Sequence, residues 1–253
     1  MINLLRSEWI KLRTVTMNWV LAIIAVGFPL VVTLLTAFFS GDNGGFDARD
    51  LAGVLTGTTV VSALLCGVIA AASITSEFGF GTIRPTFAAT PKRMHVIVAK
   101  GVVVVVATTL LAAFVVVIGW LVGSAIASNR GAEIDLGSVP TAIPAMVGAV
   151  VLTALMSLAG YGFGLITRST PVAVSILIVW PLIAEGLVGG LLTVVTSKDN
   201  IGSWMPFQAG IRMAIVESFN SGGPTRLVSG IYFGAVALAI AAIGSWSVNR
   251  RDA

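Results

Sequence analysis

The chain has 253 residues, of which 57% are hydrophobic and only 10% are charged, and its formal net charge is +4 at pH 7. Apolar stretches of about 20 residues recur along it, which is the length that a helix needs to cross roughly 30 Å of hydrocarbon. This composition excludes a soluble globular domain and predicts an all-α integral membrane protein. With one cysteine, Cys66, and one histidine, His95, the chain cannot form an intramolecular disulfide or a zinc site of several cysteines and histidines.

Residues 1–16 predict an amphipathic helix that lies in the membrane interface. Four apolar residues spaced three or four positions apart share one helical face: Ile2, Leu5, Trp9 and Leu12. Three cations point away from that face: Arg6, Lys11 and Arg13. A tryptophan suits the headgroup depth, and cations suit anionic membrane lipid. Alternatively the cations only fix the topology, and the two interpretations are compatible.

Six apolar segments follow and predict six membrane-spanning helices in a single domain, residues 1–253. They cover residues 17–39, 54–74, 101–124, 141–166, 172–195 and 227–248. The first segment lacks a small-residue cleavage pattern, so we expect a retained span rather than a signal peptide. Ten of the 15 Lys and Arg residues fall in the connections on one side and five on the other. The positive-inside rule therefore predicts that both termini and residues 76–93 face the cytoplasm of a bacterial plasma membrane.

The basic residues stand at the ends of apolar runs rather than in clusters with aromatic residues, so we expect no nucleic-acid partner. The sequence also lacks a G-x-x-x-x-G-K-[ST] loop, a G-x-S-x-G elbow, an H-E-x-x-H motif and a pair of catalytic carboxylates. The chain is therefore expected to be no enzyme by itself and to hold no metal or cofactor.

One ionisable residue, Glu185, stands in the middle of an apolar segment. A carboxylate at membrane depth is costly unless it is protonated, paired or facing water, so it is a functional candidate by default. The structural alternative is a bond to Trp180 or to a hydroxyl of a neighbouring helix. Pro181 deprives the carbonyl of Leu177 of its helical partner and predicts a local kink.

Residues 196–226 form the longest connection on the outer side and predict an extracellular loop with a short helix. Pro206 stands before an apolar pattern that includes Phe207 and Ile211. Pairs of small residues four positions apart within the apolar segments indicate close helix packing: Gly53 and Gly57, Gly119 and Gly123, Gly160 and Gly164, Gly186 and Gly190, Gly230 and Gly234.

Residues 76–93 predict a short cytoplasmic helix between the second and third spans. Gly79 and Gly81 end the preceding helix, Thr82 can cap a new one, and Pro85 is tolerated in its first turn because those amides have no intrahelical acceptor. Such a helix is suited to docking into a groove of a cytoplasmic partner, with phenylalanines as apolar anchors. The alternative is a solvated loop whose cations only fix the topology.

The order of these motifs resembles that of the permease subunits of type-2 ABC exporters. The resemblance is carried by Glu8…Lys11-Leu12-Arg13 before the first span, by Glu77…Gly81-Thr82-Ile83-Arg84…Pro91…Arg93…Ala99-Lys100 after the second, and by Met205-Pro206-Phe207-Gln208-Ala209-Gly210 before the last. It implies the six-span permease fold with an interfacial N-terminal helix. It also implies that residues 76–93 contain the coupling helix.

The resemblance further implies a dimer with a second copy or a paralogue and two separately encoded ATP-binding subunits, which bind ATP and Mg²⁺. The expected cargo is hydrophobic or amphipathic: a drug, an antimicrobial peptide or a lipid. The residues expected to contact the ATP-binding subunit are Glu77, Phe78, Gly81, Thr82, Arg84, Phe87, Pro91 and Arg93. Two alternatives stay open, a proton-coupled secondary carrier that uses Glu185 and a membrane anchor that transports nothing.

Overall fold

The computed structural model describes residues 2–40, 45–82, 93–197, 201–216 and 223–251, and this part of the chain is predominantly helical. The α-helices are α1 (Ile2–Thr14), α2 (Thr16–Ser40), α3 (Ala48–Gly79), α5 (Arg93–Asn129), α6 (Ala142–Thr167), α7 (Thr170–Val179), α8 (Glu185–Thr196), α9 (Pro206–Arg212) and α10 (Arg226–Arg251). A π-helical turn, η3 (Trp180–Ala184), joins α7 to α8, and 3₁₀ turns lie at η2 (Leu136–Ser138) and η4 (Ile201–Trp204).

Six helices within the described residues are long and apolar enough to cross a membrane: α2, α3, α5, α6, the continuous α7–η3–α8 segment and α10. The all-α membrane fold with six spanning helices is thereby confirmed. α3 and α5 have 32 and 37 residues, so at 1.5 Å per residue they measure about 48 and 56 Å. Both exceed the roughly 30 Å of hydrocarbon and extend into the aqueous interface.

These extensions are the main difference from the expected boundaries. α3 begins six residues before the predicted span because Asp47 caps it, accepting bonds from the amides of Arg49 (2.7 Å) and Asp50 (3.0 Å). α5 begins at Arg93 rather than at residue 101, so Lys100 lies within a helix instead of in a connection. Hydropathy marks the lipid-embedded part of a helix, whereas backbone hydrogen bonding carries the helix further.

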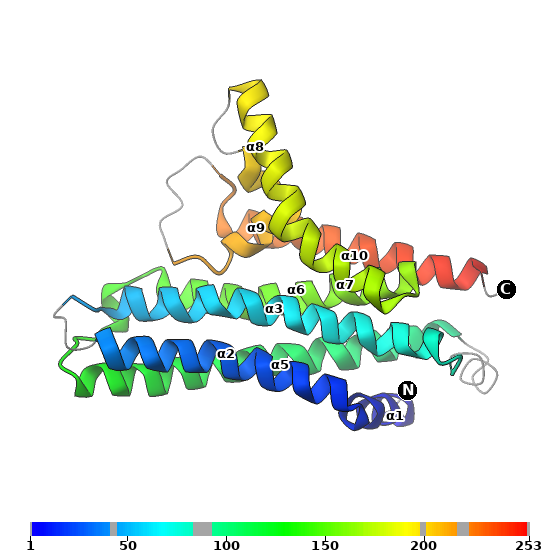
Figure 1. The fold of residues 1–253 in the computed structure, drawn as a ribbon, viewed down its shortest axis with the longest axis horizontal. Coiled ribbons are helices and arrows are strands. Elements are labelled where there is room, and N and C mark those ends of the chain that lie inside the picture. The colour runs from blue at the N-terminus through cyan, green and yellow to red at the C-terminus, as the bar shows by residue number, and fades with distance from the viewer. Residues whose placement is uncertain (1, 41–44, 83–92, 198–200, 217–222, 252–253) are drawn as a thin grey trace.

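The spanning helices are arranged as a bundle from which one segment diverges (Figure 1). α2, α3, α5 and α6 run side by side, α10 packs on α6, and the α7–η3–α8 segment leans away so that α8 leaves the bundle. α1 lies across one end of the bundle. The end of α3, the start of α5 and the last turns of α10 lie at this same end, which we call the α1 end.

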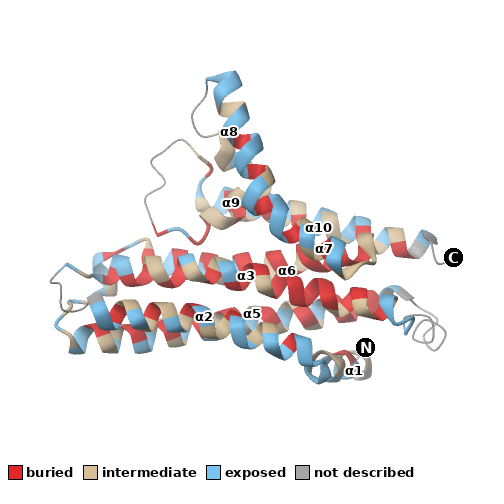
Figure 2. Cartoon of the chain, viewed as in Figure 1, coloured by how far each residue is buried: buried red, intermediate tan, exposed pale blue. Residues whose placement is uncertain are grey.

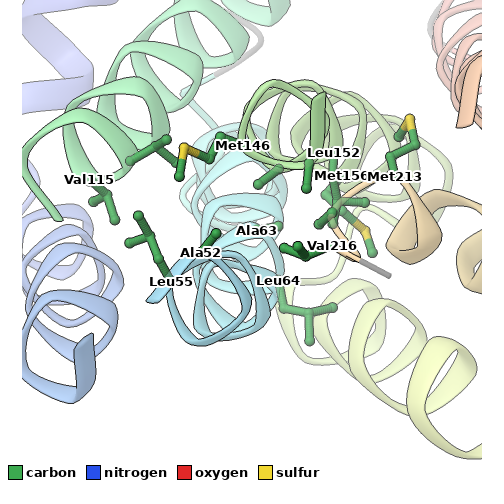
Figure 3. Packing of buried hydrophobic residues seen from close by; sticks show 14 of the residues in the cluster. Ala52, Leu55, Ala63, Leu64, Val115, Met146, Leu152, Met156, Met213 and Val216 are labelled. Carbon is green, nitrogen blue, oxygen red and sulfur yellow. The ribbon is translucent and has the colours of Figure 1, made fainter. Parts of the chain in front are cut away.

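The core lies mainly between α3 and α6, where buried residues concentrate (Figure 2). Leu55, Leu64, Leu152 and Met156 are among the apolar side chains that fill it (Figure 3). Glycine permits the close approach, because a Cβ at Gly160 would overlap the carbonyl oxygen of Gly67 on α3.

The other predicted glycine pairs differ in what they face. A Cβ at Gly119 or Gly123 would press on the side chains of leucines in α3, at 2.6 and 2.9 Å. A Cβ at Gly57 or Gly186 meets nothing within 4 Å. The Gly160 and Gly164 pair therefore lies at a close helix contact, as its spacing predicted, but the same spacing also occurs on uncovered surface.

Where a local kink was predicted at Pro181, the structure has a π-helical turn, η3. The amide of Glu185 bonds the carbonyl of Trp180, five residues earlier, instead of the carbonyl of Pro181. This wider turn accommodates the proline, which has no amide hydrogen, without ending the span.

Candidate functional site

Four charged side chains from three helices form one ion-pair network at the α1 end. Glu8 and Lys11 come from α1, Glu77 from the last turn of α3, and Lys100 is the eighth residue of α5. Lys11 Nζ lies 2.8 Å from Glu8 Oε1 and 3.1 Å from Glu77 Oε1. Lys100 Nζ lies 3.0 Å from Glu77 Oε1 and also pairs with Glu8 Oε2. Each lysine thus bridges the same two carboxylates.

Three members of this network are buried: Glu8 is 2% exposed, Lys100 5% and Glu77 8%. Charges so far from water are tolerated when each has an opposite charge in contact, and they become strongly destabilising when one partner is removed. The network therefore fastens α1 to α3 and α5.

The network changes the interpretation of α1. The helix is present where residues 1–16 predicted it, but Glu8 and Leu12 face the bundle, whereas Trp9 is 47% exposed. The expected apolar face is thus split. One side packs against the bundle, and the tryptophan side is exposed.

These contacts shift the pKa values of Glu8 and Lys11. Burial acts to raise the pKa of Glu8, but the Lys100 ammonium and the hydrogen bonds from Lys100 and Lys11 outweigh it and hold the pKa below its ordinary value. For Lys11 burial acts to lower the pKa, but the hydrogen bond to Glu8 and the charge of Glu77 raise it overall. Both groups are therefore charged at neutral pH.

A cavity of about 580 Å³ adjoins the network, between α1, the start of α2, the end of α3, α5 and Thr170 of α7. Its wall mixes the four charged residues with hydroxyl groups. Among these, Thr75 and Thr170 share a hydrogen bond of 2.6 Å. The end of α3 is thereby connected to α7 as well as to α1 and α5.

The residues expected to contact an ATP-binding subunit start at this network. α3 ends at Gly79, as predicted, and Gly81 adopts a left-handed backbone (φ 69°) that turns the chain. Thr82 Oγ1 lies 3.5 Å from the carbonyl oxygen of Glu77. Phe78 packs beneath the guanidinium of Arg168, whose Cζ lies 4.9 Å from the ring centre, whereas Phe80 is 85% exposed.

The remaining expected contacts are only partly visible. Arg84, Phe87 and Pro91 lie outside the described residues, so the predicted coupling helix does too. Arg93 is the first residue of α5, and its side chain lies outside the described part. What the structure does describe are the two helices that flank the segment, and Glu77 and Lys100 join them.

Glu185 has a different environment. Its carboxylate accepts the backbone amides of Phe207 (3.1 Å) and Gln208 (2.9 Å), and the Gln208 side chain donates to the carbonyl of Pro181 at 2.9 Å. These are the second and third residues of α9, and the first, Pro206, has no amide hydrogen. Glu185 therefore caps α9 from a neighbouring helix and ties it to η3.

Three of the four network residues, Glu8, Lys11 and Lys100, escaped sequence reasoning. All three belonged to the motifs that carried the family resemblance, yet none was singled out as a site residue. A signal existed in Glu8, a carboxylate one turn from Leu5 and Leu12 on an otherwise apolar side. Its partner on α5 could not be identified without the fold, because nothing in the spacing relates the two.

The described part of the chain is that of a multi-pass membrane protein with an ion-pair network at its α1 end, and it contains no group of three or more potential metal ligands. The family model described as ABC-2 family transporter protein matches residues 4–196, a stretch that includes all four network residues and Glu185. The chain belongs to this family, whose members are membrane-spanning permease subunits that associate with ATP-binding subunits in ABC transporters. No curated protein and no solved structure matches the chain.

Proposed function

We propose that the chain is the permease of an ATP-driven exporter in the bacterial plasma membrane, with both termini and the α1 end in the cytoplasm. It moves a hydrophobic or amphipathic substrate, such as a drug, an antimicrobial peptide or a lipid, out of the cell. Two separately encoded subunits bind ATP and Mg²⁺, and a second permease copy or a paralogue completes the path. The family, the helical fold and the distribution of cations support this proposal.

The observation that carries the proposal is the network of Glu8, Lys11, Glu77 and Lys100. Glu77 and Lys100 belong to the two helices that flank residues 83–92, where the family resemblance puts the coupling helix. A push on that segment by an ATP-binding subunit reaches α3 and α5 together, because their ends are joined. α1 moves with them through Glu8 and Lys11. The network thus converts a local contact into a joint movement of three helices.

The test is isolation of the tagged chain from native membranes in mild detergent, with mass spectrometry of the accompanying proteins and an ATPase assay. We expect a stoichiometric ATP-binding subunit. Arg84→Glu and Thr82→Pro should abolish transport and uncouple ATP hydrolysis while membrane insertion stays intact. Arg49→Glu, an exposed cation at the start of α3, is the matched control. Normal transport by the Arg84 and Thr82 variants would refute the role of this segment.

A proton-coupled carrier that uses Glu185 remains the second candidate. Its support is the carboxylate in a spanning segment, but both carboxylate oxygens accept backbone amides of α9. Under this alternative Glu185→Gln removes transport driven by a pH gradient. Export that continues in that variant with ATP and without a gradient would exclude it. Unchanged export in cells that lack the chain would instead indicate a membrane anchor.

A further inference from the structure

A second hollow, a groove of about 640 Å³, opens on the membrane-facing surface between α1, α2 and α5. We call it the α1–α2–α5 groove. α1 contributes Trp9, Leu12 and Arg13, α2 contributes residues from Asn18 to Gly27, and α5 contributes residues from Ala107 to Phe114. The lining is apolar except for Arg13, Asn18 and Thr108, and the polar residues on α1 and α2 lie at the α1 end. The groove therefore has a polar mouth and an apolar length.

The length of the groove matches one leaflet of a bilayer. From Asn18 to Gly27 the rise of α2 is about 14 Å, and half of a hydrocarbon core of roughly 30 Å is about 15 Å. Ile23 and Leu110 on its walls are 65% and 64% exposed. A Cβ at Gly27 meets nothing within 4 Å, so the far end of the groove is open. These dimensions suit an acyl chain that lies parallel to the spanning helices.

The mouth is held in shape by two hydrogen bonds across the junction of α1 and α2. Trp19 Nε1 donates to the carbonyl of Arg13 at 2.6 Å, and Asn18 Nδ2 donates to the carbonyl of Leu12 at 2.9 Å. Trp9 and Trp19 both border the opening and are about half exposed. Tryptophans at such positions occupy the headgroup depth of a membrane.

The exposed cations at the mouth of the groove favour a lipid with an anionic headgroup. Of the charged side chains of α1, Glu8 is turned inward, where it pairs with Lys100 and Lys11. Arg6 and Arg13 are exposed, and Arg13 lines the groove itself. The outward face of α1 is therefore cationic and complementary to an anionic phosphate group.

We propose that the α1–α2–α5 groove holds one anionic glycerophospholipid of the cytoplasmic leaflet as a resident ligand. An acyl chain lies between α2 and α5, and the phosphate lies at Arg13. The assignment to that leaflet depends on the orientation stated in the proposed function. Because Leu12 of α1 lines both this groove and the cavity beside the ion-pair network, the bound lipid holds α1 against the bundle.

The experiment is lipid analysis by native mass spectrometry on the chain purified from native membranes and then washed in detergent. The wild type should keep about one phosphatidylglycerol-type lipid per chain. Gly27→Phe fills the groove and should lose it, whereas Gly57→Phe, where a Cβ also meets nothing within 4 Å, should keep it. Arg13→Gln should lower the preference for anionic over zwitterionic lipid about fivefold, as expected for one cation at an anionic surface.

Equal retention by Gly27→Phe and Gly57→Phe would overturn the site, and a retained lipid without headgroup preference would overturn the role of Arg13. Should Gly27→Phe fail to fold, the melting temperature of the wild type with added phosphatidylglycerol or phosphatidylethanolamine decides. A rise with phosphatidylglycerol alone supports the proposal, and equal effects overturn it. Co-isolation of the ATP-binding subunit is scored in the same preparation, so failure of the proposed function is seen separately.

Discussion

Lys100 Nζ of α5 lies 3.0 Å from Glu77 Oε1 of α3, so the two helices that flank residues 83–92 are joined by a buried ion pair. Lys11 of α1 reaches the same oxygen of Glu77 at 3.1 Å. Three helices therefore meet at one carboxylate. Under the proposed function, a push on residues 83–92 by an ATP-binding subunit is transmitted to this junction.

Lys100→Met should be among the most damaging single changes at the α1 end. It leaves both buried carboxylates, Glu8 and Glu77, with Lys11 as the remaining lysine of the network. Loss of one member of a buried ion pair typically costs about 3–5 kcal/mol. We expect a lower melting temperature in detergent and loss of transport, measured on the purified chain and in cells.

The control for this variant is Arg49→Met, which removes an exposed cation at the start of α3. It should leave the melting temperature nearly unchanged, because isolated surface charges contribute little. A Lys100→Met protein as stable as the Arg49→Met protein would show that the network does not hold α1 in place.

The network also predicts how stability depends on pH. The pKa of Glu8 is lowered in the fold, so its contribution is present above the ordinary value of 4.5 and is lost as the pH falls through the lowered pKa. The pKa of Lys11 is raised, so its contribution is present below 10.5 and is lost as the pH rises through the raised pKa. Stability should be greatest between these limits.

Thermal unfolding from pH 3 upward checks the acid limb. Glu8→Gln should flatten the fall in melting temperature below about pH 4.5, since the variant has no Glu8 carboxylate to protonate. Glu133→Gln, which changes an exposed carboxylate, should keep the wild-type profile. Superimposable acid profiles for wild type and Glu8→Gln would contradict the assignment.

The spanning helices could be predicted from sequence because lipid demands apolar residues over a fixed length. The helix ends could not, since Asp47 extends α3 by a local capping interaction that hydropathy does not register. At Pro181 the sequence predicted a local kink, whereas the structure has a π-helical turn in which the amide of Glu185 bonds the carbonyl of Trp180.

The site was less predictable than the fold. Glu77 was singled out from its motif, but its partners come from α1 and α5, and only tertiary packing brings them together. For Glu185 the sequence indicated that the charge must be satisfied. The expected bond from Trp180 is present, but the backbone amides of Phe207 and Gln208 in α9 also donate to the carboxylate, and backbone amides carry no signature in a side-chain pattern.

Alanine substitution should have opposite effects on stability at two glycines, Gly160 at the α3–α6 contact and Gly186 on the uncovered surface of α8. Gly160→Ala puts a methyl group against the carbonyl oxygen of Gly67, and neither backbone can yield easily. We expect a cost of about 2 kcal/mol or more from overpacking. Gly186→Ala adds the same group where nothing lies within 4 Å and should be neutral or stabilise the helix by up to about 1 kcal/mol. Melting temperatures that do not separate the two variants would argue against this helix contact.

Glu185→Gln tests whether the buried carboxylate is a structural cap. A glutamine side chain has one acceptor oxygen, so it can serve Phe207 or Gln208 but not both as the carboxylate does. The start of α9 should loosen by about 1 kcal/mol, the usual cost of a lost cap. Hydrogen exchange should therefore accelerate at the amides of Phe207 and Gln208 while the amides of α3 keep their protection.

Transport by the same variant separates the two meanings of Glu185. A cap predicts that ATP-dependent export persists at a reduced level, since the oxygen of glutamine retains one of the two bonds. A proton site predicts that any dependence of transport on a pH gradient disappears, because an amide cannot carry the proton. Faster exchange at α9 with ATP-driven export retained assigns Glu185 to the support of α9. Unchanged exchange with transport abolished would instead make it part of the path.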